Sequence, residues 1–159
     1  MPSALCWALL LLSLCGLFSS PVHAVTATGP ASTIPVPNSH DTNNALHNEY
    51  VQTARAGNID VVFWGDSITY LWRSEGLQYW NQYCVPLKSV NFGIGWDRTE
   101  NLIWRIRNGE VPGPPPKVAV VLIGTNNLGW HSPSDIALGI KAVISAIQRL
   151  SPPTKVLVL

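Results

Sequence analysis

A serine lies three residues after the end of an apolar run in this chain. The run is Val61-Val62-Phe63-Trp64, and Gly65-Asp66-Ser67 comes immediately after it. A strand that ends at a glycine and leads into a helix would place the serine at the carboxyl edge of a parallel sheet, where open α/β sheets bind ligands. A hydroxyl presented in this way can serve as a nucleophile. The same tripeptide also suits a simple helix cap, so both interpretations of Ser67 stay open.

Two later loops carry groups that suit acyl transfer. Residues 91–97 follow a second apolar segment, and Gly124-Thr125-Asn126-Asn127 follow a third. Because the carboxyl ends of parallel strands meet at one edge of a sheet, we expect these loops to converge on Ser67. Acyl transfer needs a nucleophile and hydrogen-bond donors directed at the oxyanion. Asn126 and the glycine-rich backbone around Gly95 fit the donors, although both are also typical of ordinary turns.

The elements that must position these loops alternate along the chain. Continuous apolar runs predict strands whose two faces are both covered, at residues 59–64, 89–92, 118–123 and 155–159. Helical patterns occupy residues 45–56 and 74–83, and two further helices begin near Asp97 and Ser132. Asp97 with Glu100 predicts a capping box, and Ser132-Pro133 predicts a capped start with proline at the first position. This alternation predicts a three-layer α/β/α sandwich with a parallel sheet.

The N-terminal residues differ from the rest of the chain. Residues 4–18 are almost wholly apolar, and Val22-His23-Ala24 offers small residues near a cleavage point. We therefore predict a signal peptide at residues 1–24 and a secreted or extracytoplasmic protein. The apolar run is short against the roughly 20 residues that span a bilayer, so no stable membrane span is expected. Residues 25–44 lack apolar periodicity and predict a disordered linker, which leaves residues 45–159 as the domain.

Composition excludes several other classes of function. The formal net charge of +1 gives no indication of binding to nucleic acid or to an anionic membrane surface. Removal of residues 1–24 leaves Cys84 as the remaining cysteine, so no internal disulfide is expected. No metal-ligand cluster or phosphate-binding glycine motif is evident, so we expect no cofactor. The oligomeric state is left open.

The three loops, in this order and spacing, resemble the blocks of the SGNH/GDSL hydrolase family. Gly65-Asp66-Ser67 matches the first block, residues 91–97 the second and residues 124–127 the third. The chain is most similar to the catalytic-subunit type of platelet-activating factor acetylhydrolase and its bacterial esterase relatives. Residues 102–110 (Leu-Ile-Trp-Arg-Ile-Arg-Asn-Gly-Glu) also carry that likeness. The resemblance covers about residues 45–159 and implies a flavodoxin-like SGNH hydrolase fold.

The resemblance also implies roles for particular residues. Ser67 would be the nucleophile that forms an acyl-enzyme. The oxyanion hole would consist of the backbone N–H of Ser67, a backbone N–H from the second block and the side chain of Asn126. The family usually has glycine directly before the Asp of the second block, where this chain has Trp96. The second-block donor is therefore carried over to Trp96, with Gly95 as its neighbour.

Three side chains near these loops are candidates for contact with substrate. Trp72 and Trp130 follow the first and third loops, and they could join Trp96 in an apolar or sugar-stacking wall. His131 lies beside Trp130 and could also touch substrate. His40 precedes the predicted domain and His47 lies in its first predicted helix, and neither is expected to take part.

The function expected from these residues is secreted serine ester hydrolysis of a small-molecule acyl or acetyl ester, for example an acylated sugar or lipid. The family supplies its base from a late Asp-x-x-His motif, and this sequence contains none. We therefore expect a chain that stops before that block and is inactive as it stands. The alternative is an inactive fragment or pseudoenzyme that serves as a non-catalytic small-molecule or glycan binding module.

Overall fold

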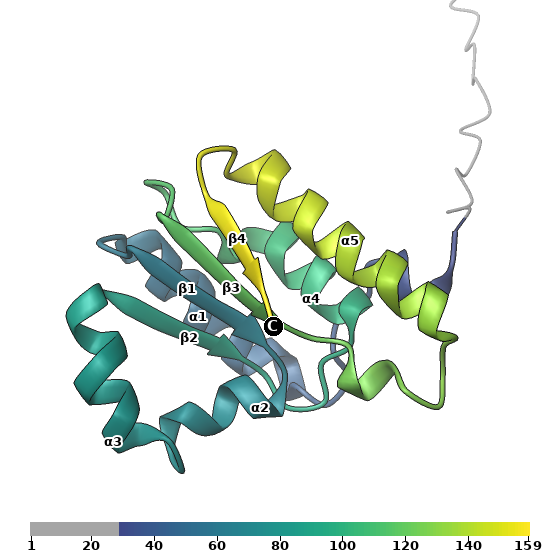
Figure 1. Ribbon diagram of the computed structural model, residues 1–159, viewed down its shortest axis with the longest axis horizontal. Coiled ribbons are helices and arrows are strands. Elements are labelled where there is room, and N and C mark those ends of the chain that lie inside the picture. The colour runs from purple at the N-terminus through teal and green to yellow at the C-terminus, as the bar shows by residue number, and fades with distance from the viewer. Residues whose placement is uncertain (1–28) are drawn as a thin grey trace, which may run out of the picture.

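A parallel sheet is the frame of this protein (Figure 1). The computed structural model describes residues 29–159. The strands lie in the order β2-β1-β3-β4, with bounds β1 Val61–Gly65, β2 Ser89–Gly93, β3 Val118–Leu122 and β4 Lys155–Val158. All neighbouring pairs are parallel. The predicted α/β fold class is therefore confirmed, and the strand that precedes Ser67 lies between two others.

Helices lie on both faces of the sheet. Their bounds are α1 Ala45–Ala56, α2 Ser67–Tyr70, α3 Leu77–Tyr79, α4 Thr99–Arg105 and α5 Pro133–Leu150. Figure 1 shows α1, α4 and α5 gathered on one face of the sheet. The short helices α2 and α3 lie near β2, toward the opposite face. The helix predicted at residues 45–56 has those bounds, and α5 begins after Ser132 and Pro133 as predicted.

The main core lies between the sheet and the three longer helices. Successive side chains of a strand point to opposite faces, and Val62 and Trp64 are both fully buried on this face. The helices contribute Tyr50, Ala54, Leu102, Ile103, Ile106, Val143, Ala146 and Ile147 to the same core. Burial of these side chains holds β1, and with it the end of β1 that precedes Ser67, in place against the helices.

The opposite face of the sheet is covered unevenly. Phe63 packs edge-on against Trp80, just after α3, with ring centroids 5.0 Å apart. β4 is an outer strand, and Leu157 remains 52% exposed there. The apolar edge strand β4 is therefore partly uncovered.

The predicted linker at residues 25–44 is wrong for the part that the structure describes. Residues 29–44, which we call the N-terminal segment, pack against the domain. The Ser32 hydroxyl donates to the carbonyl of Asp135 at 2.7 Å. The Asp41 carboxylate accepts from the backbone N–H groups of Leu46 and His47, each at 3.0 Å. The segment is held by individual polar contacts, which an analysis of apolar periodicity cannot detect.

The predicted capping box at Asp97 is also wrong. α4 begins one residue later than a cap at Asp97 implies, and the N–H of Arg98 donates to the Asn101 side chain at 2.9 Å. Asp97 is instead completely buried, because its carboxylate pairs with Arg105 from the far end of the same helix. A long-range ion pair has thus replaced the local interaction that the sequence spacing suggested.

No helix within residues 29–159 has the length and apolar character needed to cross a bilayer. The predicted signal peptide at residues 1–24 lies outside the described residues.

The junction between β2 and α2 tolerates no side chain at Gly93. A Cβ there would lie 2.3 Å from the backbone nitrogen of Tyr70, whereas a Cβ at Gly95 would meet nothing within 4 Å. We therefore expect Gly93→Ala to lower the free energy of unfolding by about 1–3 kcal/mol, the usual cost of overpacking. The matched variant Gly95→Ala should stay within about 0.5 kcal/mol of wild type. Urea unfolding measures both, and equal values would contradict the packing described.

Candidate functional site

The three predicted loops leave the sheet at one edge. Gly65, at the end of β1, is paired in register with Gly93 of β2 and with Leu122 of β3. The N–H of Ile94 then donates to the carbonyl of Gly65 at 3.1 Å, which ties the second loop to the end of β1. The loops that contain Ser67, Gly95 and residues 124–127 therefore start side by side, as the sequence predicted.

Ser67 is the first residue of α2 and is exposed. The cap of this helix is Asp66, whose Oδ1 accepts from the N–H of Ile68 at 2.9 Å. Within residues 29–159 the Ser67 hydroxyl makes no hydrogen bond. Of the two interpretations left open by the sequence, the helix-cap role thus belongs to Asp66, and the Ser67 hydroxyl is free.

Asp66 itself is only 1% exposed, and its Oδ2 has no hydrogen-bond partner within the described part of the chain. Burial raises the pKa of this carboxyl above its usual range, against the lowering effect of the Ile68 N–H. The backbone N–H of Ser67, at the first helical position, has no acceptor within the helix, because the first turn lacks preceding carbonyls. Ser67 thus carries both a free hydroxyl and a free backbone N–H.

The second loop makes a tight turn from Ile94 to Asp97. The N–H of Asp97 donates to the carbonyl of Ile94 at 3.3 Å, and Trp96 has a φ of 65°. The Trp96 N–H donates to no acceptor within residues 29–159, and its indole is 65% exposed. The turn therefore offers a second unpaired backbone donor at the position that the sequence predicted.

The third loop is joined to the second through Asn126. Its Nδ2 donates one hydrogen to the backbone carbonyl of Asp97 at 2.9 Å. An amide nitrogen carries two hydrogens, so one more remains available. The neighbouring Asn127 is fully buried and accepts from the N–H of Thr99 at 3.0 Å. The structure therefore places Asn126 against the turn that contains Trp96.

Beneath these loops lies a buried cluster of charges centred on Arg105. Its Nε and Nη2 contact one carboxylate oxygen of Asp97 at 2.7 and 2.6 Å, and its Nη1 pairs with Glu110. Its Nη2 also donates to the carbonyl of Gly65 at 3.3 Å. Glu110 accepts further from Trp64 Nε1 at 3.2 Å and contacts His47 Nδ1 at 2.9 Å.

Burial and pairing oppose one another in this cluster. Burial raises the pKa of Asp97 to about 6, although the Arg105 guanidinium acts to lower it. For Arg105, burial would lower the pKa, but the carboxylates of Asp97 and Glu110 outweigh that effect and raise it. The Asp97–Arg105 pair connects the end of β1 to the second loop.

A hollow of about 550 Å³ adjoins the second and third loops. Trp96 and Asn126 line it together with Trp130, Arg98 and His40. The Arg98 guanidinium lies over the Trp130 ring at 5.8 Å, and the His40 ring lies 5.5 Å from that of Trp96. The wall is therefore aromatic and cationic.

Two predicted substrate contacts lie elsewhere. Trp72 lines a separate apolar hollow, which it shares with Phe63 and Trp80. It therefore does not form one wall with Trp96 and Trp130. His131 lines a further hollow that Trp130 also borders, and its Nδ1 lies 3.2 Å from Asn127 Nδ2. Of the predicted substrate-contacting residues, Trp130 alone lines the hollow that contains Trp96 and Asn126.

Several residues of this region were missed from the sequence. Neither His40 nor His47 was expected to take part, yet His40 lines the hollow and His47 is buried against Glu110. Asn38 was assigned to the linker, yet it contacts the second loop. The one available signal was Arg105, a charged residue within the apolar run Leu102-Ile103-Trp104-Arg105-Ile106.

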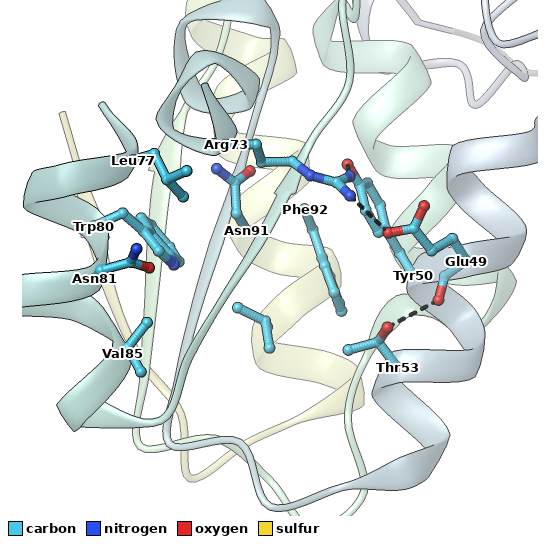
Figure 2. Close-up of a pocket in the computed structure, with 11 residues that line it drawn as sticks. Glu49, Tyr50, Thr53, Arg73, Leu77, Trp80, Asn81, Val85, Asn91 and Phe92 are labelled. Atoms are coloured by element: carbon cyan, nitrogen blue, oxygen red, sulfur yellow. Dashed lines mark hydrogen bonds and ion pairs between the residues drawn. The ribbon is translucent and has the colours of Figure 1, made fainter. Parts of the chain in front are cut away.

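A different hollow of about 340 Å³ lies at the open edge of β2 (Figure 2). Figure 2 shows Arg73 reaching over to Tyr50 and Glu49 of α1, with hydrogen bonds of 3.1 and 2.9 Å. The Tyr50 hydroxyl in turn donates to the carbonyl of Gly93 at 2.7 Å. These contacts brace the end of β2 from the side, and this hollow contains none of the predicted site residues. Within the described part of the chain, no His, Cys, Asp and Glu side chains group in a way that suits a metal ion.

Comparison with known proteins identifies the family. Residues 63–159 match the model of the GDSL-like Lipase/Acylhydrolase family. This protein belongs to that family. The matched region contains Ser67, Trp96 and Asn126, and it begins after the N-terminal segment ends.

Relatives of this GDSL-like acylhydrolase chain include subunits of a mammalian acetylhydrolase. Platelet-activating factor acetylhydrolase IB subunit alpha1 of Homo sapiens is 37% identical over 115 residues, which are 72% of this chain and 48% of the relative. Subunit alpha2 of Rattus norvegicus is 38% identical over 113 residues, 71% of this chain and 48% of the relative. The chain thus spans about half the length of these curated relatives.

Solved structures of the family share the fold. A GDSL-like lipase from Bacteroides thetaiotaomicron superposes with a TM-score of 0.53 at 19% sequence identity. The superposition covers 70% of this chain and 56% of that chain.

Removal of Arg105 should be costly, because it would leave Asp97 and Glu110 buried without their cation. We expect Arg105→Met to lower the free energy of unfolding by about 3–5 kcal/mol, the usual effect of breaking a buried ion pair on one side. The matched variant Arg107→Met alters an exposed arginine two positions away and should change stability by less than about 0.5 kcal/mol. Urea unfolding of both variants tests this, and similar midpoints would contradict a structural role for the buried cluster.

Proposed function

We propose that this chain carries the nucleophile and the oxyanion hole of a serine ester hydrolase. The observation on which the proposal rests is the free hydroxyl of Ser67 at the sheet edge from which the second and third loops also start. Family membership supports the same class of reaction. In this proposal Ser67 attacks the ester carbonyl, the alcohol leaves, and an acyl-enzyme forms that water later hydrolyses.

The oxyanion donors in the proposal are the N–H of Ser67, the N–H of Trp96 and the free Nδ2 hydrogen of Asn126. A negative charge that develops on the carbonyl oxygen needs donors that are already in place before the reaction. The proposal is supported by the finding that none of the three groups has another acceptor in the described part of the chain. The Asp66 cap fixes the first turn of α2, and the Asp97 carbonyl holds the Asn126 amide.

The hollow beside Trp96 and Asn126 is the proposed site for the remainder of a small-molecule ester. Its volume of about 550 Å³ falls within the range of small-ligand pockets. The exposed rings of Trp96 and Trp130 offer flat apolar surfaces on which a sugar ring or a lipid chain can lie. An acylated sugar or lipid is therefore the substrate class that we propose.

Removal of the Ser67 hydroxyl tests the nucleophile. The protein is treated with a fluorophosphonate probe and with p-nitrophenyl acetate, and the labelled residue is found by peptide mass spectrometry. We expect wild type to be labelled at Ser67 and Ser67→Ala to lose that labelling, whereas slow ester hydrolysis that depends only on the oxyanion donors and binding should persist in both proteins. Because the family's Asp-x-x-His motif is not present in residues 1–159, wild-type turnover should be slow, about 10³-fold over water from the oxyanion donors and binding.

The matched control is Ser74→Ala, which alters another exposed serine seven positions further along the chain and should label at the wild-type rate. Labelling that persists in Ser67→Ala would refute the assignment. A wild type that binds sugars or lipids in the hollow without reacting would favour the alternative, a non-catalytic binding module.

We also propose that the protein is exported after cleavage behind Ala24. The support is the apolar run at residues 4–18 followed by Val22-His23-Ala24. Expression in a secreting host with N-terminal sequencing of the mature protein tests this, and the expected first residue is Val25. Recovery of a cell-retained protein that still begins at Met1 would contradict it.

A further inference from the structure

The turn from Ile94 to Asp97 has a conformation that its own sequence disfavours. Trp96 is its third residue and has a φ of 65°, whereas Gly95, the second, has no positive φ. This combination, with the 3.3 Å hydrogen bond from the Asp97 N–H to the Ile94 carbonyl, defines a type II turn. The third position of such turns usually holds glycine, because a Cβ is strained at positive φ. A bulky tryptophan is therefore at the most unfavourable position of the turn.

A type I turn would join the same residues without that strain. The two types differ mainly in the orientation of the central peptide, here the bond between Gly95 and Trp96. Rotation of this peptide by about half a turn gives Trp96 a negative φ and reverses the direction of its N–H. The type of the turn therefore determines the direction in which the Trp96 N–H, the proposed oxyanion donor, points.

Asn38 of the N-terminal segment holds the strained form. Its Nδ2 donates one hydrogen to the carbonyl of Gly95 at 2.9 Å and the other to Oδ1 of Asp97 at 2.8 Å. Its Oδ1 accepts from the N–H of His40 at 2.8 Å, so the amide is oriented with nitrogen toward the turn. Asn38 is 5% exposed, so these bonds are shielded from water. All of its donors and acceptors on this side are thus committed to the turn and to its own segment.

The contact between Asn38 and the Gly95 carbonyl also sets the direction of the Trp96 N–H. In a trans peptide the C=O and the N–H point in opposite directions, so a carbonyl drawn toward Asn38 points the Trp96 N–H away from it. We propose that Asn38 is a positioning residue that locks the Gly95–Trp96 peptide so that the Trp96 N–H stays available to the oxyanion. The inference rests on the proposed function of Ser67 and extends the site to a segment that precedes the family match at residue 63.

A merely structural role for Asn38 makes a different prediction. If Asn38 only docks the N-terminal segment, any variant that loosens that segment should have the same effect. Ser32→Ala provides this comparison, since it removes a hydrogen bond of the same segment to the Asp135 carbonyl and leaves the turn untouched. If Asn38 acts through the turn, its effect should also vanish once residue 96 no longer strains the turn.

The experiment compares wild type with Asn38→Ala, Trp96→Gly, the double variant and Ser32→Ala. The rate of fluorophosphonate labelling at Ser67 reports the oxyanion donors, and crystal structures report φ at residue 96. We expect Asn38→Ala to label at least about tenfold more slowly, toward the loss seen when an oxyanion donor is removed. Its crystal structure should show Trp96 at negative φ. Ser32→Ala should label at the wild-type rate and keep the positive φ.

The rescue by glycine is the decisive comparison. In the Trp96→Gly background, where positive φ carries no strain, adding Asn38→Ala should change the labelling rate by less than about threefold. An equal loss from Asn38→Ala in both backgrounds, or a positive φ at Trp96 that survives Asn38→Ala, would overturn the proposal. If wild type is not labelled at all, the proposed function fails, and the crystal structures still decide whether Asn38 sets the turn.

Discussion

The buried guanidinium of Arg105 is the constraint on which the rest of the site depends. It contacts the carbonyl of Gly65 at the end of β1 and the carboxylate of Asp97 in the second loop. Asp97 in turn receives Asn38 on its side chain and Asn126 on its backbone carbonyl. A buried charge is tolerated only with its partners in place, so these loops cannot shift separately without exposing or orphaning an ion. One side chain therefore coordinates the segments that adjoin Ser67.

The cluster continues on the far side of Arg105 and joins the loops to the core. Glu110 shares the guanidinium with Asp97, and it also accepts from the Trp64 indole of β1 and contacts His47 of α1. Trp64 and His47 are both buried, so the hydrogen bonds are shielded from water and are correspondingly expensive to break. The position of the sheet edge is in this way linked to α1 and α4, the helices that cover one face of the sheet.

The N-terminal segment changes the description of the domain. It supplies a cap for α1 through Asp41, a wall of the hollow through His40 and a contact to the turn through Asn38. The contact of Asn38 with Gly95 joins residues far apart along the chain, whereas that of Asp41 with His47 is local. The strained φ of Trp96 makes such outside support necessary, because the local preference of the turn would favour a different peptide orientation. The segment is thus part of the site although the family match begins after it.

The sequence by itself determined the strands, α1, α5 and the order of the loops, because apolar runs, a Ser-Pro cap and glycines act locally. It also singled out Ser67 and Asn126, since the edge of a parallel sheet brings successive loops together, and the family resemblance added Trp96. Only the tertiary structure decided what Asp97 binds, that Asp66 rather than Ser67 caps α2, and that Trp72 lies apart from Trp130. Those outcomes depend on long-range charge pairing and burial, and residue spacing along a chain carries no record of which distant side chain will satisfy a buried polar group.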